Sequence, residues 1–411
     1  MSALRVDGER LWSRLMAMAE VGPGVAGGNN RLAISDDDMA GRDLLMRWAA
    51  DAGCTFECDE IGNLFATRPG SNPDKPPVLT GSHLDTQPTG GRFDGVYGVL
   101  GGLEVIETLN DHGIVTEAPI QLAVWTNEEG SRFPPSMMGS AVWAGALPLA
   151  HALKTQDFDG KSVEDELQRL GWDGDLPARP RPLTAAFELH IEQGPILEDA
   201  ALEIGVVTGV QGYRWYTIEL GGTPAHAGPT PMDLRHDPAR ALGDIIAGVY
   251  AVAAEHAPWS RATFAQFRSV PVSPNTVPET ITFSLDMRNP DGDVLRAMEE
   301  AMRTTVGEAC ARHGVTSSIQ IDADSPPVKF DDGCIAAVEQ SADALGLSHQ
   351  HMVSGAGHDA CHVAAHCPTS MIFVPCDDGV SHNEAENISA EQAEKGASVL
   401  LGAIGEMAGE S

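Results

Sequence analysis

The feature that most constrains the fold of this chain is the alternation of short apolar segments with helical ones along its first half. Apolar strands are predicted at residues 77–80, 120–125 and 185–192, and a glycine-rich helix at 96–109 separates the first two strands. This order is typical of α/β layer folds, in which helices cover the faces of a sheet. Each strand runs directly into polar residues, at the place where open α/β sheets put their functional sites.

A second kind of pattern begins near Gly212 and ends near residue 326. Residues 213–220 alternate between polar and apolar side chains, which predicts a half-exposed strand. The segments that follow are a helix, two strands, a helix and a strand, expected at 238–254, 262–267, 280–288, 291–313 and 317–321. This β-α-β-β-α-β order is typical of a ferredoxin-like domain. We therefore predict a discontinuous first domain of residues 1–211 and 327–411, with an inserted α+β domain at 212–326.

The chain carries an excess of negative charge that narrows the choice of partners. It has 26 Lys and Arg residues against 59 Asp and Glu residues, a formal net charge of −33. A surplus of this size repels phosphate backbones and anionic lipids, so we expect neither nucleic acid nor membrane as a partner. Any anion would have to be bound by a few locally placed cations.

The sequence also predicts a cytoplasmic protein. The first ten residues carry charges where a signal peptide needs an apolar segment, and no apolar run reaches the roughly 18 residues of a membrane span. The seven cysteines are scattered and form neither zinc-ribbon pairs nor a disulfide framework. We expect these thiols to be reduced.

Several residues near predicted strand ends have side chains that bind metal ions. They are His83, Asp85, Asp94, Glu128, Glu129, His190 and His382. Imidazole and carboxylate ligands together suit zinc or a similar divalent ion. Three His residues with one terminal and one bridging carboxylate would hold two ions about 3.5–4 Å apart. Each residue alone is a weak signal, because a single His at a strand end is more often structural.

Two local features strengthen this interpretation. Glycines surround Asp94 in the segment 90–95, as expected where the backbone bends tightly to aim a carboxylate at an ion. Glu128 and Glu129 follow the strand at 120–125, so both can address one site, one as ligand and the other as proton shuttle. The alternative for this pair is a solvated acidic surface in an acidic protein.

His358, His362 and His366 form a second pattern that could bind a metal. Their i, i+4, i+8 spacing could place three imidazoles on one face of a helix. Such spacing specifies a metal only loosely, and Asp359 is the only acid among them, so we favour ordinary helix packing. His358 directly follows a glycine loop and could still face an active site.

Six motifs, in order along residues 79 to 387, give the chain a family resemblance. They are Gly81-Ser-His-Leu-Asp-Thr, Gly91-Arg-Phe-Asp-Gly, Thr126-Asn-Glu-Glu-Gly-Ser-Arg-Phe, Glu188-Leu-His-Ile-Glu-Gln-Gly-Pro, Gly222-Thr-Pro-Ala-His-Ala-Gly and Ser354-Gly-Ala-Gly-His-Asp-Ala. The sequence resembles the N-carbamoyl-L-amino acid hydrolases (L-carbamoylases), with β-ureidopropionase and allantoate amidohydrolase as close relatives. All belong to the dinuclear-zinc aminoacylase and carboxypeptidase superfamily.

The resemblance implies a fold and a metal centre. The fold would be a mixed-sheet α/β catalytic domain that binds two divalent ions, with an inserted ferredoxin-like α+β lid and dimerisation domain. Zinc is the first expectation for the ions, with manganese, cobalt or nickel as alternatives. The implied ligands are His83 and His190 for one ion, Glu129 and His382 for the other, and Asp94 as the bridge between them. Glu128 would be the general base, and the Asp85 carboxylate would orient His83.

The resemblance also implies substrate contacts and a homodimer. The expected contacts are His226, Asn275 and Arg288 from the inserted domain, and Gln193 and Gly357 from the first. Arg288 is reasonable on physical grounds, because one guanidinium can bind a carboxylate bidentately. Its alternative is a surface arginine paired with Asp286 or Glu279. Two inserted domains would pair about a two-fold axis, since an exposed edge strand is open to pairing.

The implied reaction is hydrolysis of the carbamoyl group of an N-carbamoyl-L-amino acid, a small ureido substrate with a carboxylate. The products would be the amino acid, carbon dioxide and ammonia. Allantoate amidohydrolase and β-ureidopropionase activities are the nearest alternatives, and an aminoacylase or peptidase of the same superfamily is a more distant one. A non-catalytic binding protein would need a lost base or ligand, whereas Glu128 and all five ligands are present.

Overall fold

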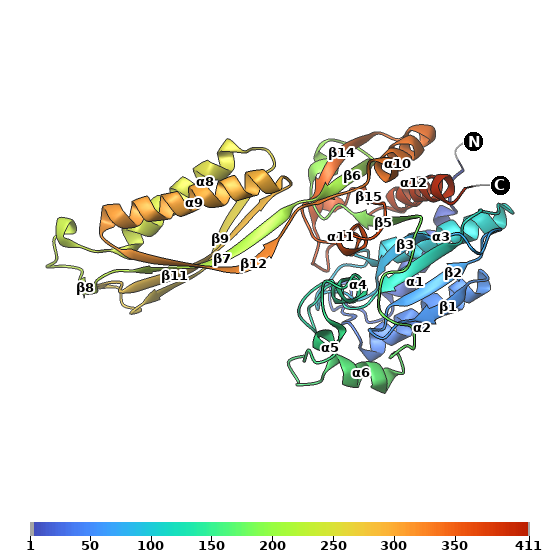
Figure 1. The fold of residues 1–411 in the computed structure, drawn as a ribbon, viewed down its shortest axis with the longest axis horizontal. Coiled ribbons are helices and arrows are strands. Elements are labelled where there is room, and N and C mark those ends of the chain that lie inside the picture. Colours follow the sequence, from blue (N-terminus) through green and yellow to red (C-terminus); the bar gives the residue numbers. More distant parts are fainter. Residues whose placement is uncertain (1–3, 410–411) are drawn as a thin grey trace. The chain divides into compact units, whose positions relative to one another are not determined.

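The computed structural model describes residues 4–409, and their contacts divide into two compact units. Unit 1 comprises the described residues up to Thr208 and from Lys329 onward, and unit 2 comprises Gly209–Val328. Unit 2 is thus an insertion into the chain of unit 1, which can be followed by colour in Figure 1.

Unit 1 is built on a nine-stranded mixed sheet. The strands follow the order β1-β2-β4-β3-β5-β15-β6-β13, and β14 pairs with β6 beside this path. β4, β3, β5 and β15 run parallel, whereas β2 joins β4 and β6 joins β15 in antiparallel fashion. Their bounds are β1 Thr55–Cys58, β2 Leu64–Arg68, β3 Val78–His83, β4 Ile120–Trp125, β5 Ala185–Ile191, β6 Ile204–Val210, β13 Val328–Lys329, β14 His349–Ser354 and β15 Thr369–Val374. The mixed sheet confirms the expected α/β class.

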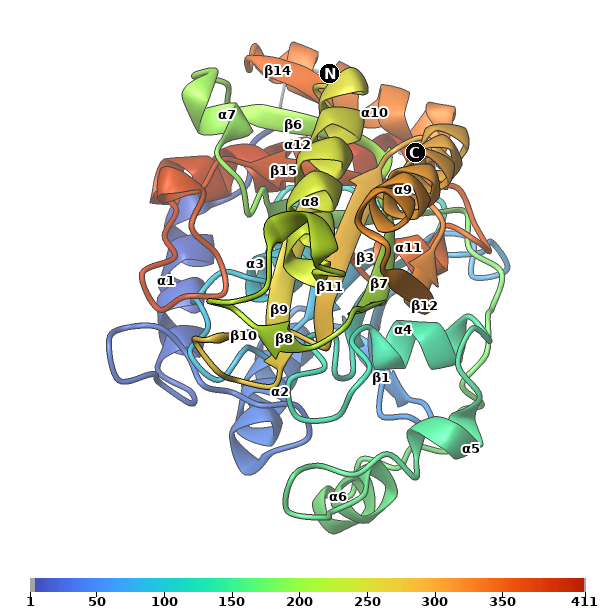
Figure 2. The ribbon, with the colours of Figure 1, turned by 90° about the vertical axis from the view of Figure 1, so that its left-hand side faces the viewer.

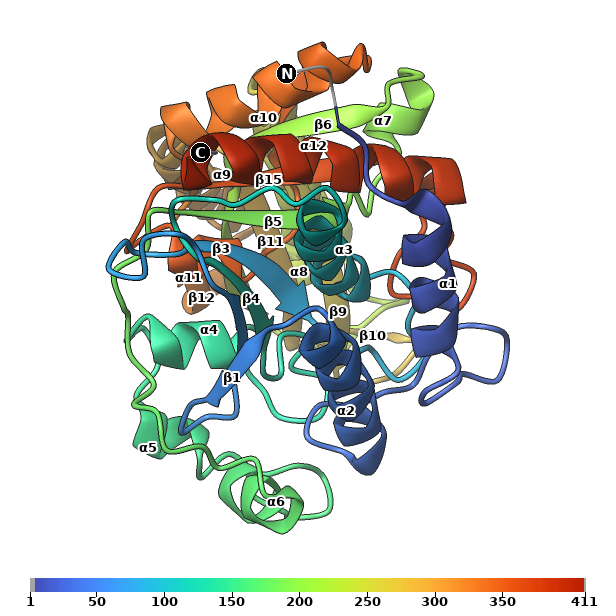
Figure 3. The same ribbon diagram turned by 90° about the vertical axis from the view of Figure 1, so that its right-hand side faces the viewer.

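Helices pack against both faces of this sheet. On one face, α1 (Gly8–Ala19), α3 (Val96–Asp111) and α12 (Ala390–Ala408) pack together, with α3 and α12 against the central strands (Figure 3). On the other face, residues of α4 (Met138–Trp143) and α11 (Ala360–Val363) join an apolar cluster with alternate residues of the strands. The remaining helices are α2 Asp36–Asp51, α5 Leu149–Ala152, α6 Val163–Leu170, α7 Ile196–Asp199, α10 Asp332–Leu345 and the 3₁₀ turn η2 Asp377–Gly379.

Local sequence signals explain where several helices begin. Ser35 accepts the N–H of Asp38 at the start of α2. Ser389 and Gln392 form a reciprocal capping box before α12. These caps satisfy backbone donors that a helix leaves without an internal partner.

The strands that lead to the site are buried along their whole length. β3, β4, β5 and β15 have no exposed residue, because helices cover both of their faces. The chain leaves this apolar layer only where each strand ends. Polar side chains therefore collect at one edge of the sheet.

Unit 2 has a four-stranded antiparallel sheet in the order β12-β7-β11-β9. Helices α8 (Pro238–Glu255) and α9 (Gly292–His313) cover one face, as Figure 2 shows, and the core lies between them and the sheet. The strands are β7 Gly212–Gly221, β9 Arg261–Val270, β11 Thr280–Asn289 and β12 Thr316–Ser325; a short pair of β8 Ala225–His226 with β10 Thr276–Val277 and the 3₁₀ turn η1 Met232–Leu234 complete the unit. This order and pairing confirm the expected ferredoxin-like arrangement.

The strands of unit 2 extend beyond the predicted segments. The sequence pattern predicts short strands at residues 262–267 and 317–321, whereas the observed strands β9 and β12 each span ten residues. Pairing with a long neighbour continues the backbone ladder past the residues that alternate in polarity. Among the described residues, none of the helices combines the length and the apolar character that crossing a membrane requires.

Candidate metal centre

Asp94 lies at the centre of a cluster of imidazole and carboxylate groups. Its Oδ1 is 3.1 Å from Nε2 of His190 and 3.6 Å from Nε2 of His83. Its Oδ2 is 3.4 Å from Nε2 of His382, and the same His382 nitrogen is 3.4 Å from Oε2 of Glu129. Two groups that could hold a metal ion share Asp94, namely His83–Asp94–His190 and Asp94–Glu129–His382. The structure thus brings together all five residues that the sequence proposes as ligands.

The topology of the sheet accounts for this convergence. His83 is the last residue of β3, and His190 lies in the adjacent parallel strand β5. Glu129 follows the end of β4, which pairs with β3 on its other side. His382 comes from the loop after η2, where its φ is +52°. Parallel strands end at one edge of a sheet, so side chains far apart in sequence meet there.

Gly95 makes room for the ring of His83. Its φ of +66° lies in the left-handed region that favours glycine. A Cβ atom at this position would lie 2.3 Å from the His83 ring, which is closer than a side chain allows. A glycine next to Asp94 is therefore required for the backbone to approach the centre.

The hydrogen bonds of the rings leave lone pairs that face Asp94. Nδ1 of His83 donates to the carbonyl of Asp85 at 2.8 Å, and Nδ1 of His190 donates to the carbonyl of Ile191 at 2.9 Å. In each neutral ring the proton is on Nδ1, so the lone pair of Nε2 points toward a carboxylate oxygen. The imidazole nitrogen and the carboxylate oxygen repel each other unless a proton or a metal ion lies between them. The residues fit divalent metal ions, because metal-binding His residues usually donate their other N–H in this way.

The electrostatics of the cluster show the same need for positive charge. Burial lowers the pKa of His83, but the neighbouring Glu128 and Asp94 outweigh burial and raise this pKa well above its usual range. Burial and the neighbouring Asp94 raise the pKa of Glu129 to about 8. Burial also raises the pKa of Glu128, with His83 opposing the shift. Carboxylates crowded in a buried place take up protons or bind cations.

Asp85 has contacts that differ from those expected. Its Oδ1 lies 3.9 Å from Nδ1 of His83, which is beyond hydrogen-bond distance, so the expectation that this carboxylate orients His83 is corrected. The ring is held by the backbone carbonyl of Asp85, which is nearer. The Asp85 carboxylate accepts the backbone N–H groups of Glu128 at 3.2 Å and Glu129 at 3.1 Å. Its side chain therefore fixes the turn that carries both glutamates.

Glu128 and Glu129 occupy distinct positions beside the centre. Glu128 belongs to neither ligand group, and its Oε2 is 3.5 Å from Nε2 of His83. Glu129 is a member of one group, and the side-chain amide of Gln87 donates to its Oε2 at 2.7 Å. One glutamate can thus act as a ligand while the other exchanges protons.

The substrate contacts expected from unit 1 lie around the centre. Nε2 of Gln193 donates to Oδ2 of Asp94 at 2.8 Å. Gly357 is exposed in the loop before α11. The next residue, His358, is buried, and its ring centroid is 4.6 Å from that of His190. The glycine loop therefore borders the centre.

The spacing of histidines at residues 358–366 does not produce a shared helix face. α11 ends at Val363, so His366 lies beyond the helix. Among the described residues, no group of possible metal ligands includes His362 or His366. Of the three histidines, only His358 belongs to such a group, which it forms with Glu188 and His190 of β5.

His226 and Asn275 lie side by side within unit 2. The pairing of β8 with β10 places His226 opposite Thr276. The N–H of Ala227 donates to the carbonyl of Asn275 at 2.8 Å. Nδ1 of His226 accepts the N–H of Gly228 at 3.1 Å, so the neutral ring carries its proton on Nε2 and can donate it to a ligand.

Arg288 is paired within its own strand. Its Nε and Nη2 lie 2.9 and 2.8 Å from Oδ2 of Asp286, and its guanidinium lies 5.6 Å from the ring centroid of Tyr213. This is the pairing with Asp286 that the sequence left as an alternative. A substrate carboxylate would have to share this guanidinium with Asp286.

Sequence reasoning missed three residues that support the centre, namely Gln87, Ser381 and Glu386. Oγ of Ser381 lies 3.2 Å from Oδ2 of Asp94. Glu386 accepts the backbone N–H groups of Phe93 and Asp94, each at 3.0 Å. Gln87 directly follows the motif of residues 81–86 that contains His83, and this position could have marked it as a residue near the centre. Glu386 has no such signal, because one more glutamate is not distinctive among 59 acidic residues.

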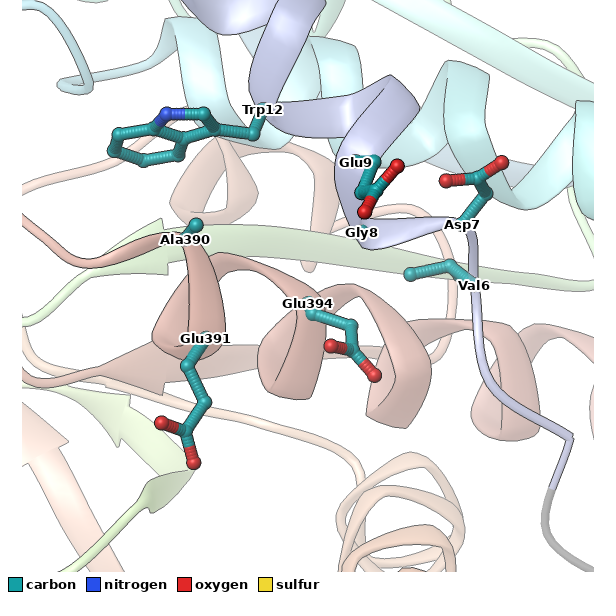
Figure 4. Close-up of a pocket in the computed structure, with 8 residues that line it drawn as sticks. All are labelled: Val6, Asp7, Gly8, Glu9, Trp12, Ala390, Glu391 and Glu394. Atoms are coloured by element: carbon teal, nitrogen blue, oxygen red, sulfur yellow. The ribbon is translucent and has the colours of Figure 1, made fainter.

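A groove elsewhere in unit 1 lacks the chemistry of this centre. It has a volume of about 490 Å³ and lies between the starts of α1 and α12 (Figure 4). Its lining consists of Val6, Asp7, Gly8, Glu9, Trp12, Ala390, Glu391 and Glu394. These side chains include no imidazole or thiol, and no cation that would attract an anionic substrate. We therefore assign the functional site to the cluster around Asp94.

Comparisons with known proteins agree with this assignment. The model of the family described as peptidase family M20/M25/M40 matches residues 79–406. The chain is 48% identical over 404 residues to the N-carbamoyl-L-amino-acid amidohydrolase of Rhizobium meliloti. The aligned region covers 98% of this chain and 97% of that protein. It is 38% identical over 407 residues to the enzyme of the same name from Geobacillus stearothermophilus, with coverage of 98% and 99%.

A solved structure shows the same similarity in three dimensions. The crystal structure of an amidase of the hydantoinase/carbamoylase family from Burkholderia multivorans has a TM-score of 0.96 and 51% identity, and covers 98% of both chains. The family match contains every residue of the centre from His83 to His382. The chain therefore belongs to peptidase family M20/M25/M40 and is a hydrolase.

Proposed function

We propose that this protein hydrolyses the carbamoyl group of N-carbamoyl-L-amino acids and releases the amino acid, carbon dioxide and ammonia. The observation that carries the proposal is the arrangement of two ligand groups that share Asp94, with Glu128 beside them and outside both. The relatives named N-carbamoyl-L-amino-acid amidohydrolase support this substrate class.

We infer that the centre binds two divalent ions, with zinc as the first expectation and manganese, cobalt or nickel as alternatives. His83 and His190 would hold one ion, Glu129 and His382 the other, and Asp94 both. Three imidazoles with two carboxylates suit ions of this class. When bound, the ions would polarise the carbamoyl group and lower the pKa of water.

Glu128 would carry the proton during the reaction. Its carboxylate would accept a proton from the attacking water and return it to the leaving nitrogen. The backbone of Glu128 is fixed by Asp85, which keeps the carboxylate directed toward the centre. A base held in this way needs no reorganisation when the reaction begins.

The remaining residues would bind and polarise the substrate. His226, with its proton on Nε2, would donate to the developing oxyanion. Asn275 and Arg288 would bind the substrate carboxylate, and Gln193 and Gly357 would contact the ureido group.

A second candidate is the hydrolysis of allantoate, which also carries ureido groups and a carboxylate. The chain is similar to an allantoate amidohydrolase from Bacillus subtilis as well, but at 32% identity against 48% for the relative from Rhizobium meliloti. This difference favours N-carbamoyl-L-amino acids.

Across a panel of substrates, release of ammonia from ureido substrates, and of the free amino acid from N-acetyl-L-amino acids, tests the proposed function. The panel contains N-carbamoyl-L-amino acids, N-carbamoyl-D-amino acids, N-carbamoyl-β-alanine, allantoate and N-acetyl-L-amino acids, each assayed with added zinc, manganese or cobalt. We expect the highest kcat/KM for an N-carbamoyl-L-amino acid. Turnover confined to allantoate or to N-acyl substrates would refute the assignment.

The roles of Glu128 and Glu129 can be separated by paired substitutions. Glu128→Gln should retain both ions and lower kcat by about 10²–10⁴-fold, because general acid–base catalysis contributes that much. Glu129→Gln should lose one ion, because an uncharged amide is a poor ligand. Metal analysis and steady-state kinetics on both variants provide the measurement. Loss of an ion in Glu128→Gln alone would reverse the two assignments.

Arg288 provides a test of carboxylate recognition. Arg288→Lys keeps the charge but removes the planar fork, so KM for N-carbamoyl-L-amino acids should rise about tenfold, with kcat changed less. Arg296→Lys serves as the matched control, because Arg296 is an exposed arginine of α9 that also pairs with an aspartate, and it should leave KM unchanged. An unchanged KM in Arg288→Lys would place carboxylate recognition elsewhere.

We propose that two chains form a homodimer through unit 2. β9 is the last strand of the four-stranded sheet, and exposed apolar side chains lie along and beyond it, including Phe267 at 55%, Val270 at 40% and Val272 at 91%. An edge strand with this character is prone to pairing, and symmetric pairing buries it. His226 and Asn275 would then act on the centre of their own subunit or on that of the partner.

Light scattering coupled to size exclusion tests the dimer. We expect a dimer at micromolar concentration for the natural chain, and at least a tenfold weaker association for Phe267→Lys, because a charged edge residue opposes strand pairing. Phe158→Lys is the matched control, since Phe158 is 98% exposed in unit 1. A monomeric natural chain would contradict the proposal.

A further inference from the structure

Glu386 is a buried carboxylate for which the reaction described above has no role. It is 1% exposed and lies four residues after His382. Its Oε1 accepts the backbone N–H groups of Phe93 and Asp94, each at 3.0 Å. Its Oε2 accepts the hydroxyl of Ser381 at 2.9 Å. One side chain thus connects the loop of His382 with the segment that carries Asp94.

The segment around Asp94 is shaped to receive this carboxylate. A Cβ atom at Gly91 would lie 2.0 Å from the carboxyl group of Glu386. No larger residue fits at Gly91 unless Glu386 moves. Gly91, three residues before Asp94, therefore leaves room for the carboxyl group of Glu386. Gly95, directly after Asp94, leaves room for the ring of His83.

Glu386 also reaches the side chain of Asp94 through a shared neighbour. Oγ of Ser381 lies 2.9 Å from Oε2 of Glu386 and 3.2 Å from Oδ2 of Asp94. Nε2 of Gln193 completes this network, at 2.8 Å from Asp94 and 3.2 Å from Ser381. The oxygen of Asp94 that faces His382 therefore accepts an N–H of Gln193, and Ser381 lies between this oxygen and Glu386 with one hydroxyl proton to share.

We propose that Glu386 is a positioning residue that fixes the shared carboxylate of Asp94, so that both ligand groups depend on it. It holds the backbone of Asp94 directly, and it orients Ser381, which lies beside the Asp94 carboxylate. Misplacing a shared ligand weakens both sites at once, whereas misplacing His382 weakens one. This inference rests on the proposed two-ion centre.

Glu384 offers a matched comparison within the same loop. Its Oε2 accepts the backbone N–H groups of Ala26 and of Gly28, the latter at 3.2 Å. Glu384 therefore also anchors the His382 loop by accepting backbone N–H groups, but from the segment of Ala26 and Gly28. Among the described residues, no hydrogen bond joins Glu384 to Asp94. A general loosening of the loop would affect Glu384 and Glu386 variants alike.

The experiment measures zinc affinity and stoichiometry by competition with a chelating dye, on the natural protein and on Glu386→Ala and Glu384→Ala. Circular dichroism checks that each variant is folded. We expect Glu386→Ala to bind both ions at least tenfold more weakly. Glu384→Ala should weaken at most the ion held by Glu129 and His382.

Glu386→Gln separates geometry from charge. Its amide oxygen can accept both backbone N–H groups, and its amide N–H can donate to Ser381, whose hydroxyl then donates to Asp94. We expect this variant to retain both ions with affinities within about threefold of those of the natural protein. A near-natural Gln variant beside a defective Ala variant would support positioning.

Three results would overturn the proposal. Natural affinity for both ions in Glu386→Ala would show that Asp94 is fixed without it. Equal weakening of both ions in Glu384→Ala would show that only loop anchoring matters. A Glu386→Gln variant as weak as the alanine variant would show that charge, not position, is required. Fewer than two ions in the natural protein would refute the two-ion centre, and with it this inference, whatever the variants do.

Discussion

The two oxygens of one carboxylate, that of Asp94, face different histidines, and the other features of the centre follow from this sharing. Oδ1 faces the histidines that the parallel strands bring together, and Oδ2 faces a histidine from a loop nearly 290 residues further along the chain. A ligand common to two groups must be held accurately, because any displacement disturbs both. The hydrogen bond from Gln193 to the carboxylate, the hydrogen bond from the backbone N–H to Glu386, and the nearby Gly91 and Gly95 meet this requirement.

The centre also concentrates negative charge where the protein is least able to solvate it. Asp85, Asp94, Glu128, Glu129 and Glu386 all lie near one another and are largely buried. Burying unpaired carboxylates is costly, and the rise in pKa at Glu128 and Glu129 expresses that cost as a tendency to take up protons. Divalent cations relieve the same repulsion without neutralising the proton shuttle. The charge pattern and the lone pairs of the histidines thus point to the same occupant.

Much of this centre could be predicted because its signals are local. Histidines at strand ends, a glycine-flanked aspartate and adjacent glutamates after a strand are visible in the sequence. The contacts of Asp85 could not be predicted, because residue type does not show whether a side chain or a carbonyl reaches a ring. For Arg288 the sequence left a substrate contact and a pairing with a nearby acid both open, and the structure shows the pairing with Asp286, two residues away on the same strand. Glu386 was hidden by the acidic composition of the chain.

The sequence by itself determined the fold class and the ferredoxin-like insertion, and its family resemblance implied the five candidate ligands and the sharing of Asp94. Apolar periodicity sets which segments become strands and helices, and the chemistry of a side chain sets which ions it can bind. Only the tertiary structure decided that the Asp85 carboxylate fixes the turn of the glutamates and that Glu386 accepts the backbone N–H of Asp94. These facts depend on distances between residues that are remote in sequence. Such distances are set by how strands pair and loops return, and no local pattern records them.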